Sequence, residues 1–150
     1  MESFPDDTSG DTPEQAEIRA GWQAYHQTLD KFAKDPTLMD LSEIQLVTVG
    51  QEAVEIVRSI QFFRDEGLKQ VGDAVFRDVE IGEPSTNGDG VRTAHVTYCL
   101  DRTQIKAVHV DTNEEAEGLV AQNTRFDLLM EQGADDIWRA ALLKTIDLKC

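Results

Sequence analysis

Two histidines, His95 and His109, have the spacing that most directly suggests chemistry. They lie in two neighbouring strand-like stretches, separated by a short turn around Arg102. If the stretches pair as a hairpin, the two imidazoles face each other across it. Such a pair could share a metal ion with Asp101 or Asp111 on the same face. The alternative is two ordinary, partly exposed strand histidines. We favour the alternative, and we expect neither a metal nor a cofactor.

The overall charge excludes several classes of partner. The chain has 150 residues, with 29 Asp and Glu against 14 Lys and Arg, which gives a net charge of −15. A duplex nucleic-acid binder needs a basic surface, and anionic lipid repels an acidic chain. The longest uninterrupted apolar stretch, Ala140–Leu143, is far shorter than the roughly 18 residues of a spanning helix. We therefore expect no nucleic-acid partner and no direct membrane insertion by these residues.

The chain begins with an acidic segment that has no basic residue. We predict a disordered leader over residues 1–11 and a single domain over residues 12–150. The leader lacks the basic start and apolar centre of a signal peptide. It is either a frayed terminus or a spacer left after processing.

The first helix has a clear start. Thr12 and Gln15 form a capping box around Pro13, which suits the first helical position. The helix should continue to about Lys34, because a proline follows two residues later. Its apolar stripe, with spacings of three and four residues, consists of Ile18, Trp22, Tyr25, Leu29 and Phe32.

A second helix and a run of strands follow. The helix is predicted over about 48–66, with Gly67 as its C-terminal cap, and residues 38–46 could form a brief helix before it. After Gly67 the apolar period changes from 3.6 to 2. The predicted strands cover about 74–83, 91–100, 104–110, 119–130 and 137–148. Helices followed by antiparallel strands indicate an α+β fold with helices on one face of a curved sheet.

At this point the chain resembles a known superfamily. The matching segments are the first helix with Trp22 and Tyr25, Glu66-Gly67-Leu68, Val96–Asp101, the hairpin from Gly133 to Trp138-Arg139, and the terminal Cys150. They are similar to the NTF2-like (SnoaL-like) superfamily, and more narrowly to secreted and lipoprotein members from actinobacteria. The resemblance implies a cone-shaped, cystatin-like fold, made by a bent antiparallel sheet wrapped over helices.

The two cysteines, Cys99 and Cys150, suggest a staple that holds the final strand, and the resemblance supports a disulfide between them. Such a bond persists only in an oxidising compartment. The alternative is two unrelated thiols, one buried and one at a frayed terminus. If the disulfide forms, the acidic leader is better interpreted as a spacer between a membrane anchor and a folded ectodomain.

Five aromatic residues could converge on the interior of the cone. We expect them mainly to fill the core, but if a void remains they would form a pocket for a small apolar ligand. These candidate ligand-binding residues are Trp22, Tyr25, Phe63, Tyr98 and Trp138. His26 lies one residue off the helix stripe, and we expect it at an edge or exposed.

Asp101 is the remaining catalytic candidate, beside His95 and His109. Enzymes that resemble this chain place an Asp or His inside the cone as a general base, where apolar walls would raise a carboxyl pKa. Asp101, however, falls at a strand end, where aspartate commonly bonds the backbone of a turn. We expect the turn role.

The resemblance implies a non-enzymatic, extracytoplasmic domain, secreted or anchored, that binds a protein partner or a small apolar ligand. The alternative is a small acid/base enzyme of the cyclase, isomerase or dehydratase type. The superfamily also allows a homodimer through its open sheet face. An enzyme would need a carboxylate or histidine at the floor of the cone, with a polar partner beside it.

Overall fold

The computed structural model describes residues 3–4, 8 and 10–150. Helix α1, Pro13–Lys34, is followed by a short 3-10 helix, Ser42–Leu46, and by helix α2, Gly50–Asp65. The strands are β1 Leu68–Val71, β2 Val75–Ile81, β3 Ser85–Thr86, β4 Arg92–Asp101, β5 Lys106–His109, β6 Thr124–Gln132 and β7 Trp138–Asp147. The predicted α+β order is confirmed, with two additional short strands: β1 after α2, and β3 in the connection between β2 and β4.

The start and end of α1 follow from its sequence. The Thr12 hydroxyl accepts from the Gln15 amide at 3.2 Å, and the Gln15 side chain accepts from the Thr12 amide at 2.9 Å. These two bonds satisfy N–H groups that have no partner within the helix. The helix ends at Lys34, before Pro36, and α2 ends before Gly67, which has a φ of +65°. The predicted capping box and both helix ends are confirmed.

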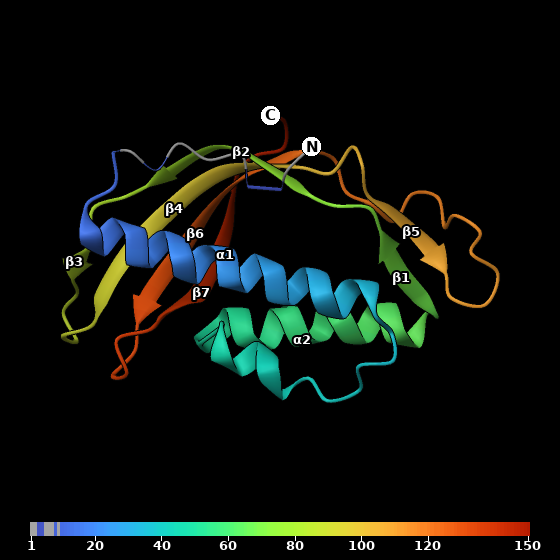
Figure 1. The fold of residues 1–150 in the computed structure, drawn as a ribbon, viewed down its shortest axis with the longest axis horizontal. Helices are drawn as coiled ribbons and strands as arrows, with labels where there is room; N and C mark the ends of the chain where they lie inside the picture. Colours follow the sequence, from blue (N-terminus) through green and yellow to red (C-terminus); the bar gives the residue numbers. More distant parts are fainter. Residues whose placement is uncertain (1–2, 5–7, 9) are drawn as a thin grey trace.

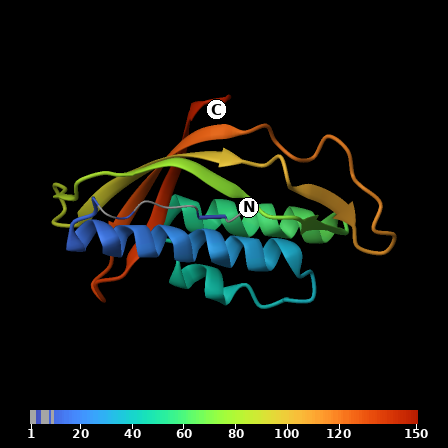
Figure 2. The same ribbon diagram turned by 45° about the horizontal axis from the view of Figure 1, so that its top comes forward.

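The main sheet bends over the two helices. Its strand order is β2-β4-β6-β7, all antiparallel, with β3 paired to one end of β4. Helices α1 and α2 lie side by side beneath the sheet, while β1 and β5 form a separate two-stranded sheet at one end of the molecule (Figures 1 and 2). This arrangement is the expected cone of a curved sheet over helices.

The expected pairing of His95 with His109 is wrong. β5 pairs with β1, which places His109 opposite Leu68, whereas His95 in β4 lies opposite Leu129 in β6. The chain leaves the main sheet after Asp101 instead of returning beside β4. The prediction missed β1, because four residues of mixed polarity give little period-2 signal.

The fourth predicted strand also begins too early, since β6 starts at Thr124 and not near Leu119. Residues 119–123 form a loop whose Asn123 side chain accepts a hydrogen bond from the Arg102 amide at 2.7 Å. The last strand, β7, agrees with its predicted range. Three consecutive apolar residues, Leu119, Val120 and Ala121, precede β6, so apolar composition alone could not locate the start of this strand.

Helix α1 contacts the sheet most closely at Gly21. A Cβ atom at this position would lie 2.5 Å from the carbonyl oxygen of Trp138 and 2.9 Å from its Cβ. The neighbouring side chain of Trp22 is completely buried in the core, and so is Tyr98 from β4. The absence of a side chain at Gly21 therefore lets the helix backbone rest directly on β7.

Some residues of the predicted leader contact the domain. The Phe4 ring stacks on Phe76, with centroids 4.9 Å apart, and the Ser3 carbonyl accepts from the Phe76 amide at 2.9 Å. Arg19 donates to Asp11 at 2.7 Å. Ser3, Phe4 and Asp11 are thus ordered by contacts that an entirely disordered leader would lack. The rest of the predicted leader, apart from Thr8 and Gly10, lies outside the described residues.

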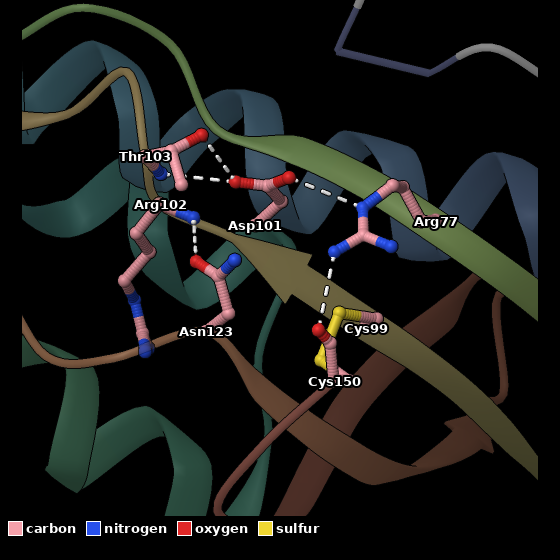
Figure 3. A network of polar contacts seen from close by, with 7 residues as sticks. All are labelled: Arg77, Cys99, Asp101, Arg102, Thr103, Asn123 and Cys150. Atoms are coloured by element: carbon pink, nitrogen blue, oxygen red, sulfur yellow. Dashed lines mark hydrogen bonds and ion pairs between the residues drawn. A yellow bond between two sulfur atoms is a disulfide. The ribbon is translucent and has the colours of Figure 1, made fainter.

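The Cys99–Cys150 disulfide is present, and it joins β4 to the end of the chain across a sequence separation of 51. Cys99 is fully buried, and Arg77 from β2 donates to the Cys150 carbonyl at 3.4 Å (Figure 3). The staple expected from the sequence is confirmed. Within the described residues, no helix is both long and apolar enough to cross a membrane.

We expect unreduced, denatured protein to show no free thiol, and reduced protein to show two. Replacing both cysteines, Cys99→Ser with Cys150→Ser, should lower the free energy of unfolding by about 4 kcal/mol, because the unfolded chain regains the entropy of an open loop. Urea denaturation of the double variant measures the change. Two titratable thiols in unreduced wild-type protein would contradict the assignment.

Gly21→Ala should lower the free energy of unfolding by about 1–3 kcal/mol, because the new methyl group collides with the backbone of β7. This is a net loss. The steric collision must cost more than the roughly 1 kcal/mol by which alanine stabilises a helix relative to glycine. Gly88→Ala is the control, since nothing lies within 4 Å of its Cβ position. A Gly21→Ala variant as stable as the wild type would show that the close contact is not required.

Candidate ligand-binding cavity

A cavity of about 440 Å³ lies between the second half of α1, helix α2 and the ends of β2 and β4. Its volume is within the range of pockets for small ligands, roughly 300–1,000 Å³. Most of its walls are apolar, contributed by Leu29, Ala33, Ile56, Ile60, Phe63 and Phe76 among others. Ser3 and Phe4 from the N-terminal segment also line it. The described lining residues with ionisable side chains are His26, Asp30 and Arg102.

His26 is half-buried and lines this cavity, which agrees with the expected position at an edge and excludes a fully exposed one. Its ring packs among four aromatic rings, with centroid distances of 4.3 Å to Phe76, 4.7 Å to Tyr25 and 5.2 Å to both Trp22 and Tyr98. The bent sheet covers a wider sector of the α1 surface than the predicted apolar stripe alone. Position 26 follows Trp22 by four residues, and this i, i+4 relation was the available signal.

The imidazole of His26 is neutral at ordinary pH. Burial, with a smaller contribution from the positive charge of Arg102, lowers its pKa to about 3. Its Nε2 atom is buried without a hydrogen-bond partner. A buried polar atom without a partner costs free energy, so this histidine lowers the stability of the core in exchange for its place among the aromatic rings.

Arg102 follows β4 directly and reaches the same cavity. Its Nη1 atom donates to the Gln122 carbonyl at 2.7 Å and to the Thr124 hydroxyl at 3.3 Å. The guanidinium carbon lies 5.6 Å from the centre of the Phe126 ring. Partial burial lowers the pKa of Arg102, but an arginine keeps its charge at neutral pH. Sequence reasoning treated Arg102 only as the centre of a turn.

Asp101 serves a turn, as expected. One carboxylate oxygen accepts from the Thr103 hydroxyl at 2.7 Å and from its amide at 3.0 Å, and the other accepts from Arg77 at 3.1 Å (Figure 3). The bonds from Thr103 are the main cause of its lowered pKa. Asp101 is absent from the cavity lining. A carboxylate held in this way is stabilised in its charged form and is a weak base.

The other two catalytic candidates, His95 and His109, lie in different sheets. His95 is exposed on the sheet face turned away from the helices, where its Nδ1 lies 2.8 Å from an Asp127 carboxylate oxygen. His109 belongs to the separate β1–β5 sheet. Among the described residues, no three His, Cys, Asp or Glu side chains are grouped as metal ligands.

Of the five aromatic candidates, Phe63 lines the cavity. The other four, Trp22, Tyr25, Tyr98 and Trp138, are at most 2% exposed and fill the core beside it. The Tyr25 hydroxyl hydrogen-bonds to the buried carboxyl group of Glu52 on α2, whose pKa is raised by burial. This pair also lies outside the lining of the cavity.

The pKa of His26 predicts a pH effect on stability. Below about pH 6.5 the unfolded chain protonates this residue, while the folded protein does not do so until about pH 3. The unfolded state then binds more protons, so stability falls as the pH falls. Between pH 6 and pH 4 the wild type should lose about 2 kcal/mol more than His26→Leu.

Chemical denaturation at a series of pH values tests this effect. NMR titration of the imidazole resonances provides a direct check, with His26 assigned by the loss of its signal in the variant. A His26 midpoint above pH 5 in the folded protein would show that the imidazole is not isolated from water.

Comparisons with known proteins bear on the fold. No family model matches the chain, and no curated protein matches it in sequence. Among solved structures, the intermembrane space region of the chloroplast protein ARC6 aligns with a TM-score of 0.55 and 10% identity, over 91% of this chain and 99% of that one.

Two bacterial structures align less well. ActVI-ORFA from Streptomyces coelicolor has a TM-score of 0.47 and 15% identity, over 90% of this chain and 98% of that one. A protein from Catenulispora acidiphila has a TM-score of 0.46 and 16% identity, over 87% and 89%. Likeness at these identities concerns the fold alone. The chain has the α+β NTF2-like (SnoaL-like) fold, with two helices packed on a curved antiparallel sheet.

Proposed function

We propose that this chain is a non-enzymatic, extracytoplasmic domain that binds a small, largely apolar ligand in the cavity between α1, α2 and the sheet. The observation that carries the proposal is the cavity itself, about 440 Å³ with mainly aliphatic and aromatic walls. Apolar pockets of this size with a few polar groups are typical of small-molecule sites. The core aromatics pack beside the cavity and leave it open.

The chemistry of the polar residues favours binding over catalysis. A general base works best when its pKa is near the operating pH, whereas the pKa of His26 is lowered to about 3. No carboxylate hydrogen-bonds to its ring among the described residues, so nothing there raises its basicity or orients it. Asp101, the other base considered, is engaged by Thr103 and Arg77.

The disulfide supports the proposed location. A bond between Cys99 and Cys150 persists in oxidising compartments and is rare in the cytosol of mesophiles. Because Cys150 is exposed, cytosolic reductants would reach the disulfide and reduce it. Secretion or attachment to the outer face of a membrane is therefore the setting that we propose.

A neutral fluorescent probe, N-phenyl-1-naphthylamine, tests the binding function. Its fluorescence should rise on binding to the wild-type protein, and Ala33→Phe, which fills the cavity from α1, should weaken binding by at least tenfold. Ala20→Phe is the matched control, because it adds the same ring to the exposed face of the same helix. Equal binding by both variants, or no binding by the wild type, would contradict the proposal.

Conversion of a bound ligand would contradict the non-enzymatic part. Mass spectrometry of ligands recovered after incubation distinguishes binding from turnover. We expect each to be recovered unchanged. A product formed by the wild type and lost in His26→Leu would instead establish the acid/base enzyme.

A further inference from the structure

We propose that the ligand of this cavity is amphipathic and carries one anionic group, of which a carboxylate is the best fit, and that Arg102 binds that group. This inference rests on the proposed binding function and specifies its ligand class. It depends on a cation that lies at the wall of an apolar cavity and has no carboxylate partner among the described residues.

Arg102 has no carboxylate partner among the described residues. Every protein group that its side chain contacts there is neutral: the Gln122 carbonyl, the Thr124 hydroxyl and the Phe126 ring. Both side-chain hydrogen bonds that Arg102 makes to described residues come from Nη1, so the N–H groups of Nε and Nη2 remain available. A buried or half-buried charge is normally paired, and a guanidinium is suited to a carboxylate through two parallel hydrogen bonds.

The nearest acidic residue in sequence does not compensate this charge. Figure 3 shows the Arg102 side chain extending away from Asp101, whose carboxylate points towards Thr103 and Arg77. The Asp101 carboxylate therefore pairs with Arg77 and not with Arg102.

Among the described residues, the cavity lining contains one other charged group, Asp30 on α1. Its carboxylate is held by Lys34 at 2.9 Å and by the Gln70 side chain at 2.9 Å. Asp30 therefore has its own cation and does not pair with Arg102. Arg102 is the only Lys or Arg among the described lining residues, so an anion in the cavity would bind there and not beside Asp30.

Two features indicate how a ligand would lie. Arg102 lines the apolar cavity and also a shallower pocket formed with Thr103, the 120–123 loop, Lys149 and Cys150, so the residue lies between the two. The charge of Arg102 also acts on His26 inside the cavity. A ligand would place its apolar part among α1, α2 and Phe76 and its anionic group against Arg102.

Matched neutral and anionic ligands test this orientation. Decanoate, decanol and methyl decanoate share an apolar chain, and each competes with N-phenyl-1-naphthylamine at pH 7, below the concentration at which it aggregates. We expect the wild type to bind decanoate at least tenfold more tightly than the two neutral compounds. Arg102→Gln should weaken decanoate binding about 10- to 100-fold, as expected for a lost charged hydrogen bond, and leave decanol binding unchanged.

Arg77→Gln is the matched control, because it removes an arginine near Arg102 that is absent from the cavity lining. Its preference for decanoate should equal that of the wild type. Equal affinity for decanoate and the neutral compounds in the wild type overturns the inference, whether or not Arg102→Gln folds. In that case probe binding would still support the proposed function. Failure of the probe and all three compounds to bind would reject the proposed function as well.

Discussion

The close contact between α1 and β7 is the constraint on which the rest of the structure depends. Gly21 has no side chain, so the helix backbone touches the Trp138 backbone and Trp22 beside it enters the core. This contact holds the first half of α1 against the main sheet. Beyond it, the partners of α1 include the separate β1–β5 sheet, and the cavity begins at His26. A helix in firm contact along its whole length would leave little space for a ligand.

The turn after β4 connects the fold to the site. Asp101 binds the Thr103 amide and hydroxyl, and the Arg102 amide binds Asn123 (Figure 3). These bonds send the chain out of the main sheet towards β5, which is why the expected hairpin does not form. The same change of direction brings the Arg102 side chain to the cavity wall. The disulfide and Arg77 hold the end of the chain beside this turn.

Burial gives the cavity an electrostatic character unlike that of the rest of the chain. The protein has a net charge of −15, yet the described cavity lining has one arginine without a carboxylate partner and one aspartate paired with Lys34. Desolvation by the surrounding aromatic rings keeps His26 neutral. An arginine in apolar surroundings fits the anionic ligand that we propose, whereas proton transfer would require a more basic group than His26.

Local sequence signals were sufficient to predict the helices, most strands and the α+β class, whereas the cone shape was implied by the family resemblance, which also supported the disulfide. The capping box at Thr12, the proline after Lys34 and the glycine after α2 act through nearby backbone atoms, so their effects can be inferred without the rest of the chain. Strand pairing could not be inferred in this way, because β1 and β5 are joined by contacts between residues about forty positions apart. His26 and Arg102 acquired their roles from that tertiary arrangement. The sequence determined which segments are helical and which are extended, while only the packing of the curved sheet decided which polar side chains became buried beside the cavity, because burial depends on distant segments that meet in space.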